Sequence, residues 1–393
     1  MKKRNMVIAQ SGGPSMVINQ SLAGAVAEAR KSDAIGKILG ARHGIAGILG
    51  NDYADMRRIS ARKLEAIAAT PSSALGSVRR KPSAEDCKAI FEEFRRLDVG
   101  WFFYIGGNDS ADAARIVAEA AQAEGYPLCA YHIPKTIDND LRSCDHTPGY
   151  GSAARFVAMA FMGDDLDNRA LGGVKIDVVM GRDAGFLTAA SALARTAPDS
   201  GPHLIYLPER PFSAERFAKD VESAVAKHGR CVVAVSEGIR CADGTPVAAR
   251  FAGGEKDSHG NMQLSGTGAL GDMLAKTVKE KTGIARVRAD TFGYLQRSFP
   301  GVASETDSAE ARAAGEAAVR FALAGLPGGT VGIERAKGKK YKVEFVRKDF
   351  SAAAKTARSM PAAFIAKNGH DVTPAFVEYA KPLVGALPQV ELL

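Results

Sequence analysis

The strongest constraint on the fold of this chain is a recurring alternation between short apolar runs and alanine-rich stretches of helical pattern. The apolar runs are NMVIAQ, VGWFFYIGG, YPLCAYHIP, VKIDVVMG, HLIYLPE and CVVAVSEG. Continuous apolar runs of this length predict strands buried on both faces, and the helical stretches beside them, such as 15–31 and 111–124, predict the connections of a parallel sheet. The sequence therefore predicts an α/β fold.

Length and composition set the broad class of protein. The 393 residues exceed what one hydrophobic core usually supports, so two domains are expected. No apolar run approaches the roughly 18 residues that cross a bilayer, and the basic start MKKRNMVIAQSGG contains too short an apolar part for a secretory signal. The 5 cysteines are scattered and form no CxxC pair, which is typical of a protein of the reducing cytoplasm.

A formal net charge of +8 is compatible with small anionic substrates or with nucleic acid. The basic residues are spread along the chain, and the one local cluster, RAKGKKYKVEFVRK at 335–348, has the pattern of a hairpin that turns at Gly338 with a solvated face. We therefore expect neither a nucleic-acid nor a membrane partner.

The loops that follow the predicted strands are the places to search for chemistry, because ligands of such sheets bind beyond the carboxyl ends of the strands. The first loop is SGGPS, in which Gly12 and Gly13 allow backbone N–H groups to approach a ligand closely. The helix that follows points its positive end at the same place, which suits a phosphate. The alternative is that Gly12 and Gly13 are needed only for the backbone conformation of a tight turn and bind no ligand.

A second loop, IGGNDS, repeats this arrangement and adds polar groups. Asn108 and Asp109 offer oxygen ligands of the kind that Mg²⁺ prefers, and Ser110 is placed to cap the following helix. The alternative is that Asp109 or Ser110 only caps the helix, but a capping role does not explain the neighbouring side-chain amide of Asn108.

A third loop, PKTIDND, places a cation, a hydroxyl and two carboxylates within seven residues: Lys135, Thr136, Asp138 and Asp140. In an extended segment Asp138 and Asp140 point the same way, so that one can lie near a metal while the other accepts a proton. An Asx-rich turn has a similar composition, but two phosphate-type loops in the same half of the chain favour a catalytic site.

Two other glycine patterns carry less weight. No GxxxxGK[ST] motif occurs, which argues against a Walker-type NTPase. GTGALG at 266–271 matches GxGxxG formally, with Asp290 about twenty residues further on, but the preceding HGNMQLS does not form a buried strand. A dinucleotide site is therefore not expected there.

Taken in order, the motifs SGGPS, LGSVRR, IGGNDS, PKTIDND, VVMGRDAGFLT, VSEG and RADTFGYLQR resemble the phosphofructokinase family. The resemblance implies two Rossmann-like three-layer α/β/α domains with the active site in the cleft between them. It implies a phosphoryl-donor domain at 1–146, completed by part of 289–350, a sugar-phosphate domain at 147–288, and an extension at 351–393 that packs on the domains. The implied activity is Mg²⁺-dependent phosphoryl transfer to the 1-hydroxyl of fructose 6-phosphate, a reaction of glycolysis and gluconeogenesis.

The resemblance also implies roles for individual residues. Asp138 is the expected base, with Lys135, Thr136 and Arg182 as further catalytic residues and Asn108 and Asp109 as metal ligands. The donor would contact Gly12, Gly13, Arg79, Gly107, Asp109 and Lys135. The acceptor would contact Thr136, Asp138, Asp140, Met180, Gly181, Arg182, Glu237, Arg288, Tyr294 and Arg297.

Four positions bear on the choice of donor within the family. Asp109 replaces a small residue of members that use ATP, and a carboxylate there would repel the α-phosphate of a nucleotide. Lys135 replaces a glycine of those members and suits pyrophosphate. Tyr294 replaces a histidine, and Ile45 stands where some of those members offer an aromatic residue to adenine. All four favour pyrophosphate, and hence a reversible reaction.

The sequence departs from the family pattern at two places. Asn108 stands where an aspartate is usual, which weakens it as a metal ligand. Gly173, with Lys175 close by, stands where an arginine from a neighbouring subunit is usual, which puts that contact in doubt. Three alternatives stay open: ATP as the donor, sedoheptulose 7-phosphate as the acceptor, and a non-catalytic sensor of the same fold. A homodimer or homotetramer is expected.

Overall fold

The computed structural model describes residues 3–250, 268–338, 340–354 and 357–392, and the chain divides into two compact units. The first unit comprises residues 1–150 and 305–358, and the second comprises 151–304 and 359–393. Within the described ranges, no helix combines the length and the apolar character needed to cross a membrane.

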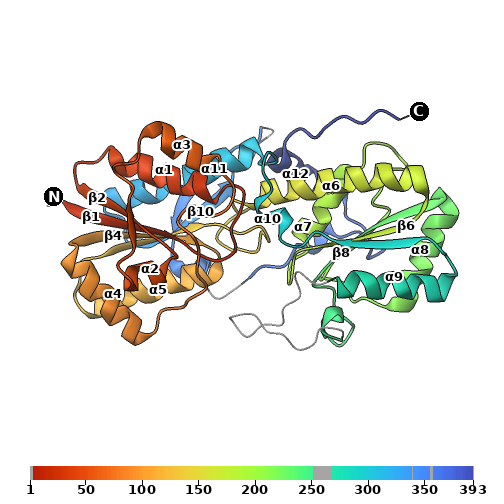
Figure 1. The fold of residues 1–393 in the computed structure, drawn as a ribbon, viewed down its shortest axis with the longest axis horizontal. Helices are drawn as coiled ribbons and strands as arrows, with labels where there is room; N and C mark the ends of the chain where they lie inside the picture. The colour runs from red at the N-terminus through yellow and green to blue at the C-terminus, as the bar shows by residue number, and fades with distance from the viewer. Residues whose placement is uncertain (1–2, 251–267, 339, 355–356, 393) are drawn as a thin grey trace. The chain divides into compact units, whose positions relative to one another are not determined.

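The first unit contains a seven-stranded sheet in the order β11-β10-β5-β4-β1-β2-β3 (Figure 1). Its strands are β1 (Arg4–Gln10), β2 (Ile35–Ala41), β3 (Tyr53–Asp55), β4 (Val99–Gly106), β5 (Cys129–Pro134), β10 (Gly329–Arg335) and β11 (Val343–Lys348). The five inner strands are parallel, whereas the edge strands β3 and β11 run antiparallel to their neighbours. Strands β10 and β11 form the hairpin that the basic segment 335–348 predicts.

Helices cover both faces of this sheet, as the continuous apolar strands predict. All eight residues of β4 are buried, and from Trp101 to Ile105 the side chains alternate between two hydrophobic clusters. One cluster packs under α1 (Ile18–Arg30), α3 (Ala61–Ala68) and α11 (Glu305–Leu323). The other packs under α2 (Ile45–Leu49), α4 (Ala84–Arg96) and α5 (Asn108–Ala123). The first unit is therefore a three-layer α/β/α domain.

Helices α1 and α11 approach so closely that only glycine fits at their crossing. A Cβ atom added to Gly24 would lie 2.1 Å from the carbonyl oxygen of Arg312, and one added to Gly315 would lie 2.1 Å from that of Ser21. Real Cβ atoms do not reach such distances, so both glycines have a packing role. The close crossing attaches α11, which is distant in sequence, to the N-terminal half of the chain.

The second unit contains a parallel four-stranded sheet in the order β7-β8-β6-β9. Its strands are β6 (Gly173–Val179), β7 (Leu204–Tyr206), β8 (Arg230–Ser236) and β9 (Val287–Thr291). Helices α8 (Ala214–His228) and α9 (Ala269–Thr282) pack on one face, and α6 (Tyr150–Leu171) and α7 (Phe186–Ala189) lie on the other (Figure 1). The remaining elements are η1 (Ala190–Ala194), η2 (Val247–Arg250), α10 (Leu295–Ser298), η3 (Phe350–Ala352), η4 (Ala362–Phe364) and α12 (Pro374–Val384).

The units divide the chain differently from the boundaries expected on resemblance. Residues 289–304 belong to the second unit because β9 pairs with β6 in its sheet. The C-terminal extension is shared, since 351–358 belongs to the first unit and 359–393 to the second. In the second unit Phe376 of α12 is fully buried, and η1 packs against α12. The tail therefore forms part of the second core.

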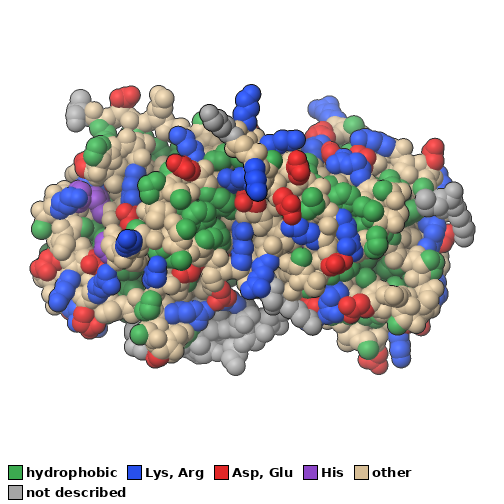
Figure 2. Space-filling view, turned by 180° about the vertical axis from the view of Figure 1, so that it is seen from behind, with side chains coloured by type: hydrophobic (Ala, Val, Ile, Leu, Met, Phe, Trp, Pro, Cys, Tyr) green, Lys and Arg blue, Asp and Glu red, His purple; other side chains and the backbone are tan. Residues whose placement is uncertain are grey.

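Charged side chains of both signs are mixed on one face of the molecule. On the face drawn in Figure 2, lysine and arginine side chains are interspersed with aspartate and glutamate, with apolar atoms between them. This pattern is typical of a solvated surface.

Candidate active site

Three loops meet at one edge of the sheet in the first unit, because β1, β4 and β5 are neighbouring parallel strands. The backbone N–H of Ser11, which follows β1, donates to the carbonyl of Ile105 at 2.8 Å. The N–H of Lys135, which follows β5, donates to the carbonyl of Gly106 at 2.9 Å. The loops SGGPS, IGGNDS and PKTIDND are therefore assembled side by side, as the search rule for parallel sheets predicts.

The glycine loop after β1 is built around the ammonium group of Lys135. Gly12 has a φ of +75°, which favours glycine, and a Cβ at this position would lie 3.4 Å from Lys135 Nζ. The same Nζ donates to the carbonyl oxygen of Gly13, and Lys135 is only 3% exposed. A nearly buried cation thus lies against the loop that the sequence assigns to phosphate. Arg79 follows Val78, whose carbonyl accepts from Gly12 N–H at 3.4 Å.

Helix α5 begins directly after the second loop, at Asn108, with Gly107 as its N-cap and no side-chain cap. The expectation that Ser110 caps this helix is wrong, because its hydroxyl lies 3.0 Å from that of Ser11 and links the first two loops. The side-chain oxygen of Asn108 accepts from Asp109 N–H at 3.0 Å, and Asp109 is exposed in the first turn. The positive end of α5 therefore lies beside Lys135 and the Gly12 loop, a setting that favours an anion.

The third loop turns at Asn139 instead of running extended. Asn139 has a φ of +58°, a left-handed conformation that asparagine tolerates, so the expectation of an extended Asp138–Asp140 segment is wrong. The two carboxylates nevertheless interact: burial and the neighbouring Asp138 raise the pKa of Asp140 to about 7. Thr136 Oγ1 accepts from Asp138 N–H at 3.1 Å, which fixes the start of the turn.

The turn is held by Arg358, a residue that the sequence analysis missed. Its guanidinium donates to the carbonyl oxygen of Asn139 at 2.8 Å and to the side-chain oxygen of Asn139 at 2.9 Å, and its backbone N–H donates to Asp140 at 2.8 Å. Asn139 is fully buried and also accepts from Thr147 N–H at 3.0 Å. No local pattern around Arg358 indicates this role, because the two residues are 219 positions apart.

Replacing Arg358 with alanine is expected to lower kcat for the reaction proposed below by about 10- to 100-fold, because the Asp138–Asp140 turn loses its clamp. The KM values of both substrates should stay within about threefold, since Arg358 is a positioning residue. Arg347→Ala is the matched control, because Arg347 also donates to backbone carbonyls, those of Pro327 and Gly328, away from this loop. Steady-state kinetics of the two variants test whether Arg358 positions the Asp138–Asp140 turn. An unchanged kcat in Arg358→Ala would show that this contact is not needed for turnover.

The raised pKa of Asp140 predicts how stability depends on pH. In the unfolded chain this carboxyl ionises near 3.8, so between about pH 4 and pH 7 the folded protein holds a proton that the unfolded chain has lost. This contribution to stability decreases as the pH rises through that range and is lost above about pH 7. Asp140→Asn should therefore raise Tm, relative to wild type, by about 2–4 °C more at about pH 8 than at about pH 5. Calorimetry on this variant and on the exposed control Asp33→Asn checks the difference, which should be absent in the control.

A second group of predicted residues lies at the ends of β6 and β8 in the second unit. Gly181 has a φ of +138°, its N–H donates to Glu237 Oε1 at 3.4 Å, and its carbonyl accepts from Ser236 Oγ at 2.6 Å. Met180 and Glu237 are nearly buried, and Arg182 is partly exposed. The segments VVMGR and VSEG are therefore joined at neighbouring strand ends, as the sheet order requires.

The residues expected to bind the 6-phosphate follow β9, or lie within it. Arg288 is exposed, and the Arg297 guanidinium lies 4.7 Å from the centre of the Tyr294 ring, which is 50% exposed. The sequence analysis missed Gln296, which is fully buried and accepts from Met180 N–H at 3.3 Å. Gln296 thereby connects the GYLQR segment to the end of β6.

Lys175 has a local role in the second unit. Its ammonium lies 3.5 Å from Asp164 and 3.6 Å from Asp177, and it also contacts Asp290. Asp177 is fully buried, and burial followed by the Asp164 charge raises its pKa well above the ordinary value. Lys175 is thus the counter-ion of three carboxylates, and the Asp290 that follows the GxGxxG-like segment belongs to this cluster. Residues 259–267, which include all of HGNMQLS and the first two residues of GTGALG, lie outside the described residues.

The donor set of the first unit fits Mg²⁺. This ion is usually held by one or two carboxylates together with substrate phosphates and waters. Asp109 is exposed at the positive end of α5, and Asp138 and Asp140 lie on the loop that follows the adjacent strand. Within the described ranges, one group of three carboxylates is close enough to hold an ion without substrate: Asp164, Asp177 and Asp290. The ammonium of Lys175 already lies among these three carboxylates and neutralises their charge. Ile45 is fully buried in the core, so its side chain contributes nothing to donor contact.

The glycine loops, the buried lysine and the paired carboxylates define an α/β phosphotransferase. The phosphofructokinase family model matches residues 5–322. A pyrophosphate–fructose 6-phosphate 1-phosphotransferase of Rhodospirillum rubrum is 53% identical over 386 residues, 98% of this chain and 95% of the relative. A protein of the same name from Xanthomonas campestris is 41% identical, with 98% and 92% covered. The crystal structure of a pyrophosphate-dependent phosphofructokinase from Nitrosospira multiformis matches with a TM-score of 0.88 at 35% identity, covering 99% of this chain and 94% of that one. The chain belongs to the phosphofructokinase family.

Proposed function

We propose that this protein transfers a phosphoryl group reversibly between pyrophosphate and the 1-hydroxyl of fructose 6-phosphate. The products of the forward direction are fructose 1,6-bisphosphate and phosphate. The observation that carries the choice of donor is the Lys135 ammonium, which is nearly buried against the Gly12–Gly13 loop. The names of the two relatives reported above support the same donor and acceptor.

Pyrophosphate suits the first unit because its charge is compact. The N–H groups of Gly13 and Gly107, the Lys135 ammonium, Arg79 and the positive end of α5 offer donors and positive charge to a small polyanion. The N–H of Gly12 donates to the carbonyl of Val78 at 3.4 Å and would have to exchange this weak bond for one to pyrophosphate. Asp109 in the first turn of α5 would repel the additional phosphate of a nucleotide. This combination favours pyrophosphate over ATP.

Asp138 is the proposed general base. It takes the proton from the 1-hydroxyl as that oxygen attacks the nearer phosphorus, and the bond to the leaving phosphate breaks. Burial and the charge of Asp138 raise the pKa of Asp140 to about 7, so Asp140 holds a proton to higher pH than an ordinary carboxyl group does. Thr136 orders the loop through Asp138 N–H and is placed to bond the transferring phosphate.

Mg²⁺, held by Asp109 and Asn108 with help from Asp138 or Asp140, would neutralise the charge of the phosphates when bound. In the second unit Met180, Gly181, Arg182 and Glu237 would hold the sugar hydroxyls, and Arg288, Tyr294 and Arg297 would bind the 6-phosphate. Arginine suits phosphate because its planar group forms two parallel hydrogen bonds. We further propose a homodimer or homotetramer in the cytoplasm.

The experiment that tests the function compares donors. Fructose 1,6-bisphosphate formation is measured from fructose 6-phosphate and Mg²⁺, with pyrophosphate and ATP supplied in separate reactions. Activity with pyrophosphate alone is the expected outcome. Activity with ATP alone would overturn the donor, and turnover with sedoheptulose 7-phosphate in place of fructose 6-phosphate would change the acceptor.

A further inference from the structure

His146 lies in the segment that follows the Asp138–Asp140 turn, and its ring is enclosed by two carboxylates. The residue is only 3% exposed. Its Nδ1 atom lies 2.8 Å from Asp145 Oδ1, and its Nε2 atom lies 2.6 Å from Glu310 Oε2 on α11. An ionised carboxylate only accepts hydrogen bonds, so both ring nitrogens can donate only when the imidazole carries its second proton. The geometry therefore fits a charged histidine between two carboxylates.

The titratable and charged groups around the ring come from its own loop, from α11 and from the β10–β11 hairpin. Tyr341 donates its hydroxyl to Glu310 Oε1 at 2.5 Å, and this hydroxyl lies 3.1 Å from His146 Nε2. Arg335 donates through Nε to Asp145 Oδ1 at 3.1 Å. Burial lowers the pKa of His146, but the hydrogen bonds and charges of the two carboxylates outweigh burial, so the pKa lies above its ordinary value near 6.5.

The segment 145–148, which contains this ring, is bonded to the loop that carries the proposed base. Thr147 N–H donates to the side-chain oxygen of Asn139 at 3.0 Å. The carbonyl of Pro148 accepts from Thr136 N–H at 3.1 Å. A displacement of this segment would therefore displace the catalytic turn as well.

Two further charged residues hold the same segment. Arg358 donates to the carbonyl of Asp145 at 2.6 Å, and Asp307 Oδ1 on α11 accepts from Gly149 N–H at 2.8 Å. The His146 ring and Asp307 thus attach the two ends of the segment to α11.

We propose that His146 is a positioning residue whose charged ring, held between Asp145 and Glu310, fixes the Asp138–Asp140 turn for phosphoryl transfer. This inference rests on the proposed function, in which Asp138 is the base. A neutral imidazole has one N–H, so one of the two carboxylates would lose its donor, and a shift of the segment would relieve that loss. A displacement of about 1 Å at a catalytic group can lower turnover about 100-fold. Turnover should therefore decrease as the pH rises through the pKa of His146.

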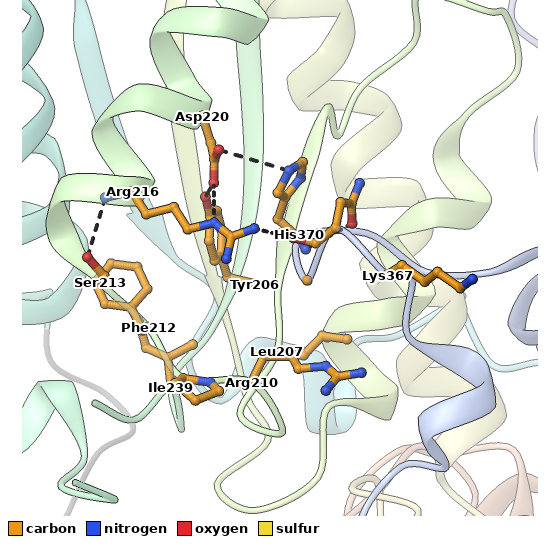
Figure 3. Close-up of a pocket in the computed structure, with 13 residues that line it drawn as sticks. Tyr206, Leu207, Arg210, Phe212, Ser213, Arg216, Asp220, Ile239, Lys367 and His370 are labelled. Atoms are coloured by element: carbon orange, nitrogen blue, oxygen red, sulfur yellow. Dashed lines mark hydrogen bonds and ion pairs between the residues drawn. The ribbon is translucent and has the colours of Figure 1, made fainter. Parts of the chain in front are cut away.

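His370 of the second unit provides a matched comparison. Its Nε2 atom lies 4.0 Å from Asp220, and Figure 3 shows this pair beside Tyr206, whose hydroxyl donates to Asp220 at 2.7 Å. The Nδ1 atom of His370 is buried and has no hydrogen-bond partner among the described residues. His370 also belongs to the unit that does not contain Asp138. The same substitution at His370 is therefore the control.

The test compares kcat of wild type, His146→Gln and His370→Gln from about pH 6 to about pH 9, with pyrophosphate, fructose 6-phosphate and Mg²⁺ saturating. Glutamine, like neutral imidazole, offers both a donor and an acceptor, but it never carries the charge. The ratio of wild-type kcat to that of His146→Gln should be about tenfold or more at about pH 6 and should fall toward one at about pH 9, with KM values within about threefold. The titration of substrates and of other groups cancels in this ratio. For His370→Gln the ratio should stay near one.

Glu310→Gln removes the charge on the other side of the contact. It should lower kcat by a similar factor at about pH 6, and the double variant with His146→Gln should lose no more than either single variant. Glu316→Gln, on the same helix and 3.4 Å from Arg320, is its control and should keep wild-type turnover. The urea midpoint of unfolding is a readout that does not need the reaction. Its difference between wild type and His146→Gln should shrink as the pH rises, because a raised pKa stabilises the fold only while the proton is bound.

A kcat ratio near one at every pH would overturn the positioning role, even if the urea midpoints differed. A ratio above one that did not change with pH would mean that His146 acts through its size and would overturn the role of its charge. The same fall of the ratio in His370→Gln would also overturn the proposal. If wild type showed no turnover with pyrophosphate, the proposed function would fail, whereas a midpoint difference independent of pH would separately overturn the charged state of His146.

Discussion

Replacing Asp138 with alanine is expected to lower kcat about 1,000-fold in the forward reaction, because no other group on the loop can take the proton of the 1-hydroxyl. Asp140, the nearest carboxylate, is separated from Asp138 by the left-handed turn at Asn139, so it does not occupy the position of the lost base. The KM values should change little, since the base acts mainly in the transition state.

Three measurements distinguish a role of Asp138 as general base from a role in packing. Asp138→Asn keeps the size of the side chain and should lose as much activity as Asp138→Ala, whereas a packing role would be preserved by the amide. The same factor should be lost in the reverse direction, from fructose 1,6-bisphosphate and phosphate, because one transition state serves both directions. Asp33→Ala, an exposed carboxylate of the same unit, should keep wild-type turnover. Turnover of Asp138→Ala within tenfold of wild type would remove Asp138 from the role of base.

The sequence could predict the strands and the three glycine and aspartate loops because each depends on a short local pattern. Continuous apolar runs placed β1, β4 and β5, and the order of parallel strands then required their loops to meet at one edge. The helix starts were less accurate. Helix α1 begins at Ile18 rather than Ser15, and α5 begins at Asn108 rather than Ala111. Helix ends depend on caps and on neighbouring loops, and those contacts are not local.

Residues that act over long sequence distances could not be predicted. Arg358 clamps a loop 219 positions away, and Gln296 meets Met180 across 116 positions. Arg358 belongs to no recognisable local pattern, and Gln296, although it lies within the RADTFGYLQR motif, is of a residue type that is ordinarily found on the surface. Lys175 lies close to Gly173, where an arginine from a neighbouring subunit is usual in the family, but the sequence does not indicate its partners. Its counter-ions come from α6, β6 and β9, which only the fold brings together. Local pattern therefore identifies the reacting groups, and the fold identifies the groups that hold them.

The second large effect is expected at Lys135. Replacing it with methionine should lower kcat/KM for pyrophosphate about 100- to 1,000-fold, because the charge that faces the Gly12–Gly13 loop is lost from a nearly buried position. Methionine has a similar length and leaves no unpaired charge in the interior. Lys88→Met, at an exposed position on α4, is the matched control and should behave as wild type. Steady-state kinetics with pyrophosphate varied at saturating fructose 6-phosphate provide the measurement.

Lys135 and Asp109 together should determine which donor is used, because one attracts a compact polyanion and the other repels a longer one. In Asp109→Gly/Lys135→Gly, kcat/KM for pyrophosphate should fall at least as far as in Lys135→Met, and any turnover with ATP should rise above that of wild type. The repulsive and attractive parts separate in the single variants. Asp109→Gly should raise turnover with ATP and should also lower pyrophosphate activity because Asp109 is a proposed Mg²⁺ ligand, whereas Lys135→Met should lower pyrophosphate activity without admitting ATP. If Lys135→Met kept kcat/KM for pyrophosphate within about threefold, the buried ammonium would be a structural partner of the Gly13 carbonyl alone. The choice of donor would then have to come from groups other than the loop at the end of β5.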